Sequence, residues 1–249
     1  MSQTVLSLVI VLLFAAVHIL GKGMVFLQST PRSAWLSLAG GVSVAYVFVH
    51  LLPELAEHQE TFRRETEHRP GPLAGMESHT YLIALLGLAV FYGLDRLART
   101  SARQEERAGR EKRPSKGAFW LHLGSFAIYN VLIGYLLLHR EETDLRGLLI
   151  YGVAMGLHFI VNDQGLREHH GRAYDEQGRW ILAAAPLLGW GIGLVTELPA
   201  LAIAALFAFL AGGVVLNVLK EELPEERESR FWAFAAGTGA YAALLLATG

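Results

Sequence analysis

The sequence predicts an all-α, polytopic membrane protein, folded as a single transmembrane domain of eight helices over residues 1–249. Its composition is the first reason, because 53% of the 249 residues are hydrophobic, only 18% are charged, and the mean hydropathy is +0.36. A soluble domain of this length needs more charge to cover its surface. The second reason is that the charges form short blocks between apolar runs of about twenty residues, the length of a transmembrane helix.

Eight apolar runs are long enough to cross a bilayer, since a helix rises about 1.5 Å per residue and the hydrocarbon core is about 30 Å thick. The first run has no basic residues before it and no evident cleavage site, so we expect it to remain as a helix. The charged segment between the third and fourth runs is expected to be a mobile loop. The predicted spans are residues 4–21, 34–56, 79–98, 117–138, 147–166, 180–198, 200–219 and 231–248.

Basic residues are concentrated on one side of the predicted membrane. Counting Arg96 at the end of the third span, the segments that follow the first, third, fifth and seventh spans hold 16 of the 21 lysines and arginines. Such residues accumulate in cytoplasmic loops. We therefore expect both termini outside and, because the loops are short, a multi-pass protein of a bacterial inner membrane.

Several classes of protein are excluded by what the sequence lacks. There is no cysteine, so disulfides and thiolate metal sites are ruled out. No HExxH or GxSxG motif occurs, so an enzyme is not predicted. The basic residues form no single stripe, so nucleic acid is not an expected partner. The expected partners are the lipid bilayer, a divalent metal ion and, in a homodimer, a second copy of the chain; no cofactor is expected.

Two distant spans share a short pattern. The second contains Gly-Gly-Val from Gly40 and Leu-Pro-Glu around Pro53, and the seventh repeats both around Gly212 and Pro224. These spans run in opposite directions, and similar segments in opposite orientations are typical of the inverted repeats of secondary transporters, here helices 1–3 against helices 6–8. The same residues are also frequent at helix contacts and helix ends, so both interpretations stay open.

The fifth span places polar residues at membrane depth, within the sequence GLHFIVNDQG. His158 lies near its middle, Asn162 is one turn further on the same face, and Asp163 lies about 100° round the helix. Asn130 is similarly deep in the fourth span. Imidazole, carboxylate and amide oxygen together suit a divalent cation such as zinc, manganese or iron(II). The alternative is an interhelical hydrogen-bond network worth about 0.6–2 kcal/mol per contact.

The layout resembles the ZIP family of divalent-metal transporters. Eight spans with both ends outside, VHLLPEL at the end of the second span and GG…EELPEE in the seventh carry the resemblance, which covers nearly the whole chain. It implies a metal site between the fourth and fifth spans, where Asn130 and His158 match positions of the family's motifs. As a carrier, the chain would use His50 and Glu54 as an outer-end relay. The corresponding inner-end residues are Glu221, Glu222 and Glu225.

The metal motifs differ from the family's pattern at several ligand positions. The residues found at those positions are Tyr129, Ile133, Phe159, Asn162 and Ala185. Because the bridging carboxylates are missing, we do not expect a two-metal site. The predicted function is a ZIP-like carrier that moves zinc, iron or manganese into the cytoplasm through a single-metal site with fewer ligands than the family's. Its candidate ligands are Asn130, His158, Asn162, Asp163, His50 and Glu54. The alternative is a transport-inactive ZIP-like membrane protein with a scaffold or regulatory role.

Overall fold

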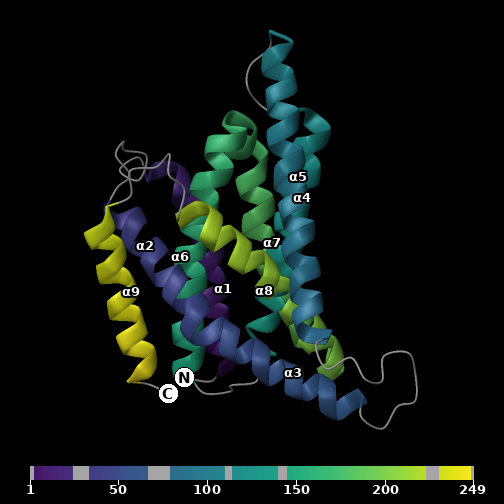
Figure 1. Cartoon of the computed structure of the whole chain (residues 1–249), viewed down its shortest axis with the longest axis vertical. Coiled ribbons are helices and arrows are strands. Elements are labelled where there is room, and N and C mark those ends of the chain that lie inside the picture. The colour runs from purple at the N-terminus through teal and green to yellow at the C-terminus, as the bar shows by residue number, and fades with distance from the viewer. Residues whose placement is uncertain are drawn as a thin grey trace.

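The structure, a computed structural model, describes residues 3–24, 34–66, 79–109, 114–139, 145–222 and 230–247. Every regular element in those ranges is helical, as the sequence predicted (Figure 1). A π-helical turn, Val47–Leu51, joins α2 to α3 in one rod, and another, Tyr174–Gly178, leads into α7. The helices are α1 (Gln3–Leu20), α2 (Ala34–Tyr46), α3 (Leu52–Thr66), α4 (His79–Arg107), α5 (Lys116–Leu136), α6 (Leu145–His170), α7 (Arg179–Val195), α8 (Ala200–Glu222) and α9 (Phe231–Leu246).

Seven helical rods among the described residues are long and apolar enough to cross a membrane. The eighth, α9, is apolar but has only 16 residues. Many large apolar side chains on the outside of the bundle are exposed, including Leu13, Ile128, Val153 and Trp232. An apolar exterior of this extent fits a lipid environment and not water. The chain is therefore a multi-pass membrane protein, as predicted.

Successive rods alternate in direction, so α1 begins and α9 ends at the same end of the bundle, the lower end in Figure 1. Helices α1, α4 and α6 end at the opposite, upper end (Figure 1). We call these the lower end and the upper end.

Two predicted loops are partly helical. The sequence predicts a mobile loop over residues 99–116, but α4 continues to Arg107. No glycine or proline interrupts this stretch until Gly109, whose φ of 72° suits a helix C-terminus. The predicted outer loop from residue 57 likewise begins as the end of α3, which reaches Thr66. Charged residues at helical spacing continue both helices beyond their apolar cores.

The second rod changes its hydrogen bonding just before Pro53. Proline has no backbone N–H and its ring crowds the preceding turn, which interrupts a regular α-helix. The π turn over Val47–Leu51 takes up this irregularity, and α3 starts at Leu52. The turn lies within the predicted span 34–56; it contains the candidate ligand His50 and is followed by the candidate ligand Glu54.

The helices pack as two groups. In the first, which we call the α6 group, α1, α5, α6 and α7 pack on one another. In the second, the α8 group, α2 packs against α9, and α3 and α4 pack against α8. The groups meet where α2 and α8 contact α6 and where α4 and α8 contact α5. The boundary between the groups passes through the middle of the bundle.

Reciprocal glycines hold three helix pairs in close contact. Between α2 and α9, a Cβ added at Gly41 would lie 2.1 Å from the carbonyl oxygen of Phe234, and one at Gly237 would lie 2.2 Å from that of Leu38. Small residues allow membrane helices to approach this closely. The other two pairs, α4 with α8 and α5 with α7, meet in the same way through Gly87 with Gly212 and Gly134 with Gly189.

Candidate functional site

One face of α6 lines a pocket at each end of the bundle. The residues of this face are spaced three or four positions apart in the sequence, which places them in one stripe along the helix. The stripe lies at the boundary between the α6 group and the α8 group, and both pockets are completed by residues of α5 and α8. We call this the pocket face of α6. From the lower to the upper end it consists of Tyr151, Met155, His158, Asn162, Gly165 and His169.

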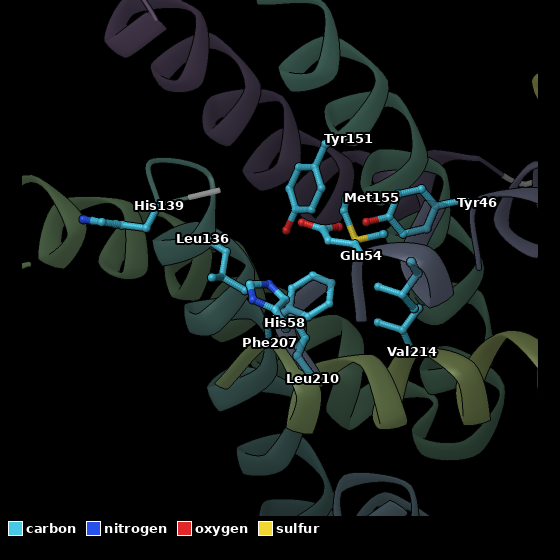
Figure 2. Close-up of a pocket in the computed structure, with 11 residues that line it drawn as sticks. Tyr46, Glu54, His58, Leu136, His139, Tyr151, Met155, Phe207, Leu210 and Val214 are labelled. Carbon is cyan, nitrogen blue, oxygen red and sulfur yellow. The ribbon is translucent and has the colours of Figure 1, made fainter. Parts of the chain in front are cut away.

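The lower pocket contains a carboxylate among aromatic side chains. Figure 2 shows the hydroxyl ends of Tyr46 and Tyr151 pointing toward the carboxylate of Glu54, with His58 close by. The Nε2 atom of His50 lies 3.5 Å from Glu54 Oε2. The structure thus brings together the two residues predicted as an outer-end relay, and it places Glu54 in a cavity wall.

The middle of the pocket face holds a three-residue cluster. The Nε2 atom of His158 lies 2.7 Å from the Tyr129 hydroxyl and 2.9 Å from Nδ2 of Asn162. All three side chains are buried. Because both neighbours can donate to the same ring nitrogen, we assign the lone pair to Nε2 and the proton to Nδ1. The lone pair that a metal ion would use is therefore already occupied by two donors.

The upper pocket lies between α5, α6 and α8 and includes Asn162, the last member of the central cluster. Asn217 and Lys220 enter it from α8, and His122 enters it from α5. Nδ1 of His122 is 2.9 Å from Nε2 of His170. His122 was not predicted from the sequence, although it precedes Tyr129 by seven residues and so falls on the same face of α5.

A second polar network lies on another side of α6, around His18 of α1. Nδ1 of His18 is 2.7 Å from Asp163 Oδ1, and its Nε2 is 3.0 Å from Nδ2 of Asn130. Tyr174 donates its hydroxyl to the same carboxylate oxygen, and Asn130 also donates to the carbonyl of Leu182. An Nδ1–H donating to Asp163 and an Nε2 accepting from Asn130 satisfy both ring nitrogens. We call this the His18 network. His18 was not predicted as a site residue because a lone histidine in an apolar helix gives no spacing signal.

The candidate ligands of the fourth and fifth spans therefore fall into two groups. His158 and Asn162 lie on the pocket face, whereas Asn130 and Asp163 belong to the His18 network. A metal site between the fourth and fifth spans would need His158 and Asn130 to face each other, but Asn130 is bonded to His18. The physical reason is the turn of about 100° between adjacent helix positions, which directs Asp163 away from Asn162 and toward α1.

No group of three or more His, Asp or Glu residues that could hold a metal ion occurs among the described residues. The side chains of Glu221 and Glu222, and the whole of Glu225, lie outside those residues, so the predicted inner-end relay is not described. The side chains on the pocket face that could bind a metal ion are mostly neutral.

Comparison with models of known protein families found no match, and comparison with curated proteins found none. The resemblance to the ZIP family therefore rests on the order of the spans and on the short motifs quoted above, and it remains a prediction.

Proposed function

We propose that the chain is a ZIP-like membrane carrier for a divalent cation, zinc, iron or manganese, which passes along the pocket face of α6. One observation carries this proposal. A single helix face lines a pocket at each end of the bundle and holds a histidine between them, at the boundary of two helix groups. Ionisable and polar residues at membrane depth commonly mark such pathways.

The chemistry of the central cluster suits one weakly held ion. The cation would bind the Nε2 lone pair of His158 once the Tyr129 hydroxyl and the Asn162 amide turn their oxygen atoms toward it. All three donors are neutral, so they offset little of a double positive charge in a low-dielectric setting. The carboxylate of Glu54 in the lower pocket, beside His50, supplies the negative charge that first attracts the cation.

The direction of transport follows from the loops. Helices α1, α4 and α6 end at the upper end and basic segments follow them in the sequence, so the upper end is the cytoplasmic side by the positive-inside rule. Both termini are then outside, and the lower pocket with Glu54 faces outward. The carrier would take up the cation at the lower pocket and release it into the cytoplasm at the upper pocket.

The packing supports the inverted repeat of the ZIP-like bundle. In that repeat α1, α2–α3 and α4 correspond to α7, α8 and α9, so the contact of α2 with α9 corresponds to that of α8 with α4. Both contacts are made by reciprocal glycines, and each uses one glycine of a Gly-Gly-Val pattern, Gly41 or Gly212. Pro224, the predicted counterpart of Pro53, lies outside the described residues.

Uptake by purified protein in lipid vesicles tests the carrier. Vesicles that enclose a metal-sensitive dye should report zinc, manganese or iron(II) entry with the native chain, and none above empty vesicles with His158→Ala. The variant should unfold at nearly the native temperature, which separates loss of transport from loss of fold. Absence of uptake of all three metals by the native chain would contradict the carrier.

A scaffold or regulatory protein without transport is the second candidate. It is favoured by the direct hydrogen bonds of 2.7–3.0 Å that already occupy His158 and His18. In that case the buried polar groups only link helices by hydrogen bonds. His158→Ala would then lower stability by about 1 kcal/mol, the scale of an interhelical polar contact.

A further inference from the structure

One exposed face of α4 changes from apolar to basic toward the upper end of the bundle. Its lower part presents Leu82, Leu85 and Tyr92, which are all exposed on the outside of the bundle. Steps of three and four residues continue this stripe along the helix to four exposed arginines. We call them the arginine stripe: Arg96, Arg99, Arg103 and Arg107. A lipid-facing surface thus continues into a cationic one on a single helix face.

The protein itself neutralises little of this charge. Arg96, Arg103 and Arg107 have no ion-pair partner among the described residues, and Arg99 donates from its Nε to Asp95 Oδ2 at 2.9 Å while its side chain remains 45% exposed. The exposed arginines at the other end of the bundle are different. There, Arg63 and Arg64 of α3 both bind Glu60. The arginine stripe is therefore able to bind an anion from outside the chain.

Tryptophans indicate where the membrane surface lies at the upper end, since tryptophan is enriched at membrane–water interfaces. Four exposed tryptophans lie near the start of helices that begin at this end: Trp35 of α2, Trp120 of α5, Trp180 of α7 and Trp232 of α9. Helices α4 and α5 pack on each other, with the Ser101 and Ser115 hydroxyl oxygens 3.0 Å apart. Arg96 and Trp120 each lie about 7.5 Å below that contact along their helices. Arg96 is therefore at the level of the tryptophans.

The next arginines of the stripe lie in and just above the headgroup layer, where α4 extends beyond the neighbouring helices (Figure 1). This layer adds about 5–7.5 Å on each side of the hydrocarbon core. Arg99 lies about 4.5 Å and Arg103 about 10.5 Å above Arg96 along the helix. Side chains of an α-helix lean toward its N-terminus, which for α4 is the lower end, so both guanidinium groups lean back toward the headgroups. Arg107, about 16 Å above Arg96, lies beyond them.

We propose that Arg96, Arg99 and Arg103 bind the headgroup of one anionic phospholipid in the cytoplasmic leaflet. Guanidinium groups hold phosphate oxygens through paired N–H donors, and three of them on successive turns of one face converge on a phosphate near Arg99. The acyl chains lie along Leu85 and Tyr92 of the same stripe, which favours a lipid over a soluble phosphate. This site does not rest on the carrier proposal, because lipid binding is measured without a metal ion.

Native mass spectrometry tests the lipid site. The purified chain is released from mixed micelles that contain phosphatidylglycerol and phosphatidylcholine in equal amounts with the same acyl chains, so that only the headgroup charge differs. We expect each chain to retain one phosphatidylglycerol in preference to phosphatidylcholine. Glycerol phosphate, which has the charge but no acyl chains, should not displace it. Equal retention of the two lipids, or displacement by glycerol phosphate, would overturn the proposal.

Variants assign the preference to the arginine stripe. Arg96→Gln and Arg103→Gln should each reduce it about fivefold, and the double variant about twentyfold, since each basic residue near the surface contributes separately. Both side chains are exposed, so the unfolding temperature should stay close to the native value. The controls Arg107→Gln, beyond the headgroups, and Arg63→Gln, whose charge Glu60 already neutralises, remove the same charge and should keep the preference. A preference that survives in the double variant, or that falls equally in the controls, would show that the arginine stripe is not the site.

Discussion

Two sides of the same helix, α6, use similar residues for different purposes. The His18 network joins α1, α5, α6 and the turn before α7, all within the α6 group, through Asp163 and Asn130. The pocket face carries His158 and Asn162 to the boundary with the α8 group, where a cavity lies on either side of the cluster. The hydrogen-bond partners on both sides belong to the α6 group, so the difference lies in the surroundings: only the pocket face borders cavities that α8 completes.

The largest expected effect is on stability, from His18→Leu. This change removes the N–H that Asp163 accepts at 2.7 Å and leaves a carboxylate buried at 1% exposure. Breaking a buried pair in this way costs about 3–5 kcal/mol. The matched variant His158→Leu removes only a neutral cluster and should cost no more than about 1 kcal/mol. Unfolding free energies in mixed micelles measure both, and equal losses would show that the two sides of α6 do not differ.

The next largest effect is on metal uptake, and a comparison of two asparagines distinguishes loss of transport from loss of stability. Asn130 and Asn162 are both buried and bond to a histidine at 3.0 and 2.9 Å. Asn162→Leu should reduce metal uptake at least tenfold, since it removes a donor on the pocket face. Asn130→Leu should retain most of the uptake and lower stability by about 1 kcal/mol. Vesicle uptake and thermal unfolding of both variants check this, and loss of uptake in Asn130→Leu would place the His18 network in the pathway.

A smaller effect probes how tightly the His18 network is packed. A Cβ added at Gly21 would lie 3.2 Å from Asp163 Oδ2 and 3.3 Å from a guanidinium nitrogen of Arg167. We expect Gly21→Ala to lower stability by about 1 kcal/mol, because the carboxylate must shift from its donors. Gly23 lies in the same short turn with nothing within 4 Å of its added Cβ. Gly23→Ala is therefore the control, and similar unfolding temperatures for the two variants would contradict the prediction.

The last prediction concerns orientation and involves no loss of stability. A reporter fused at Gly109, at the upper end, should read cytoplasmic, and one fused in the segment after α3, at Gly71, should read external. The expectation follows from the concentration of basic residues. Gly71 lies outside the described residues, but α3, which precedes it, ends at the lower end (Figure 1). The opposite result would place Glu54 on the cytoplasmic side and reverse the direction proposed for uptake.

Much of the fold follows from the sequence because apolar length has a direct physical meaning in a membrane. The predicted spans agree with the helices to within a few residues at most ends. The errors occur where polar helix extends beyond the apolar part, as after residue 98 in α4 and after residue 56 in α3. Hydropathy detects only the part of a helix that lies in the hydrocarbon core. Helix propensity and charge spacing decide how far the same helix extends into water.

The sequence by itself determined that this is a multi-pass helical membrane protein and that polar residues lie deep in its fifth span. It also placed His158 and Asn162 on one face, because the helical repeat is fixed at about 3.6 residues per turn. Only the tertiary structure decided the partners. His18 and His122 come from other helices, and Asp163 turned toward α1 instead of completing a metal site. Which side of a helix meets a neighbour depends on the packing of all the helices, and no local pattern encodes it.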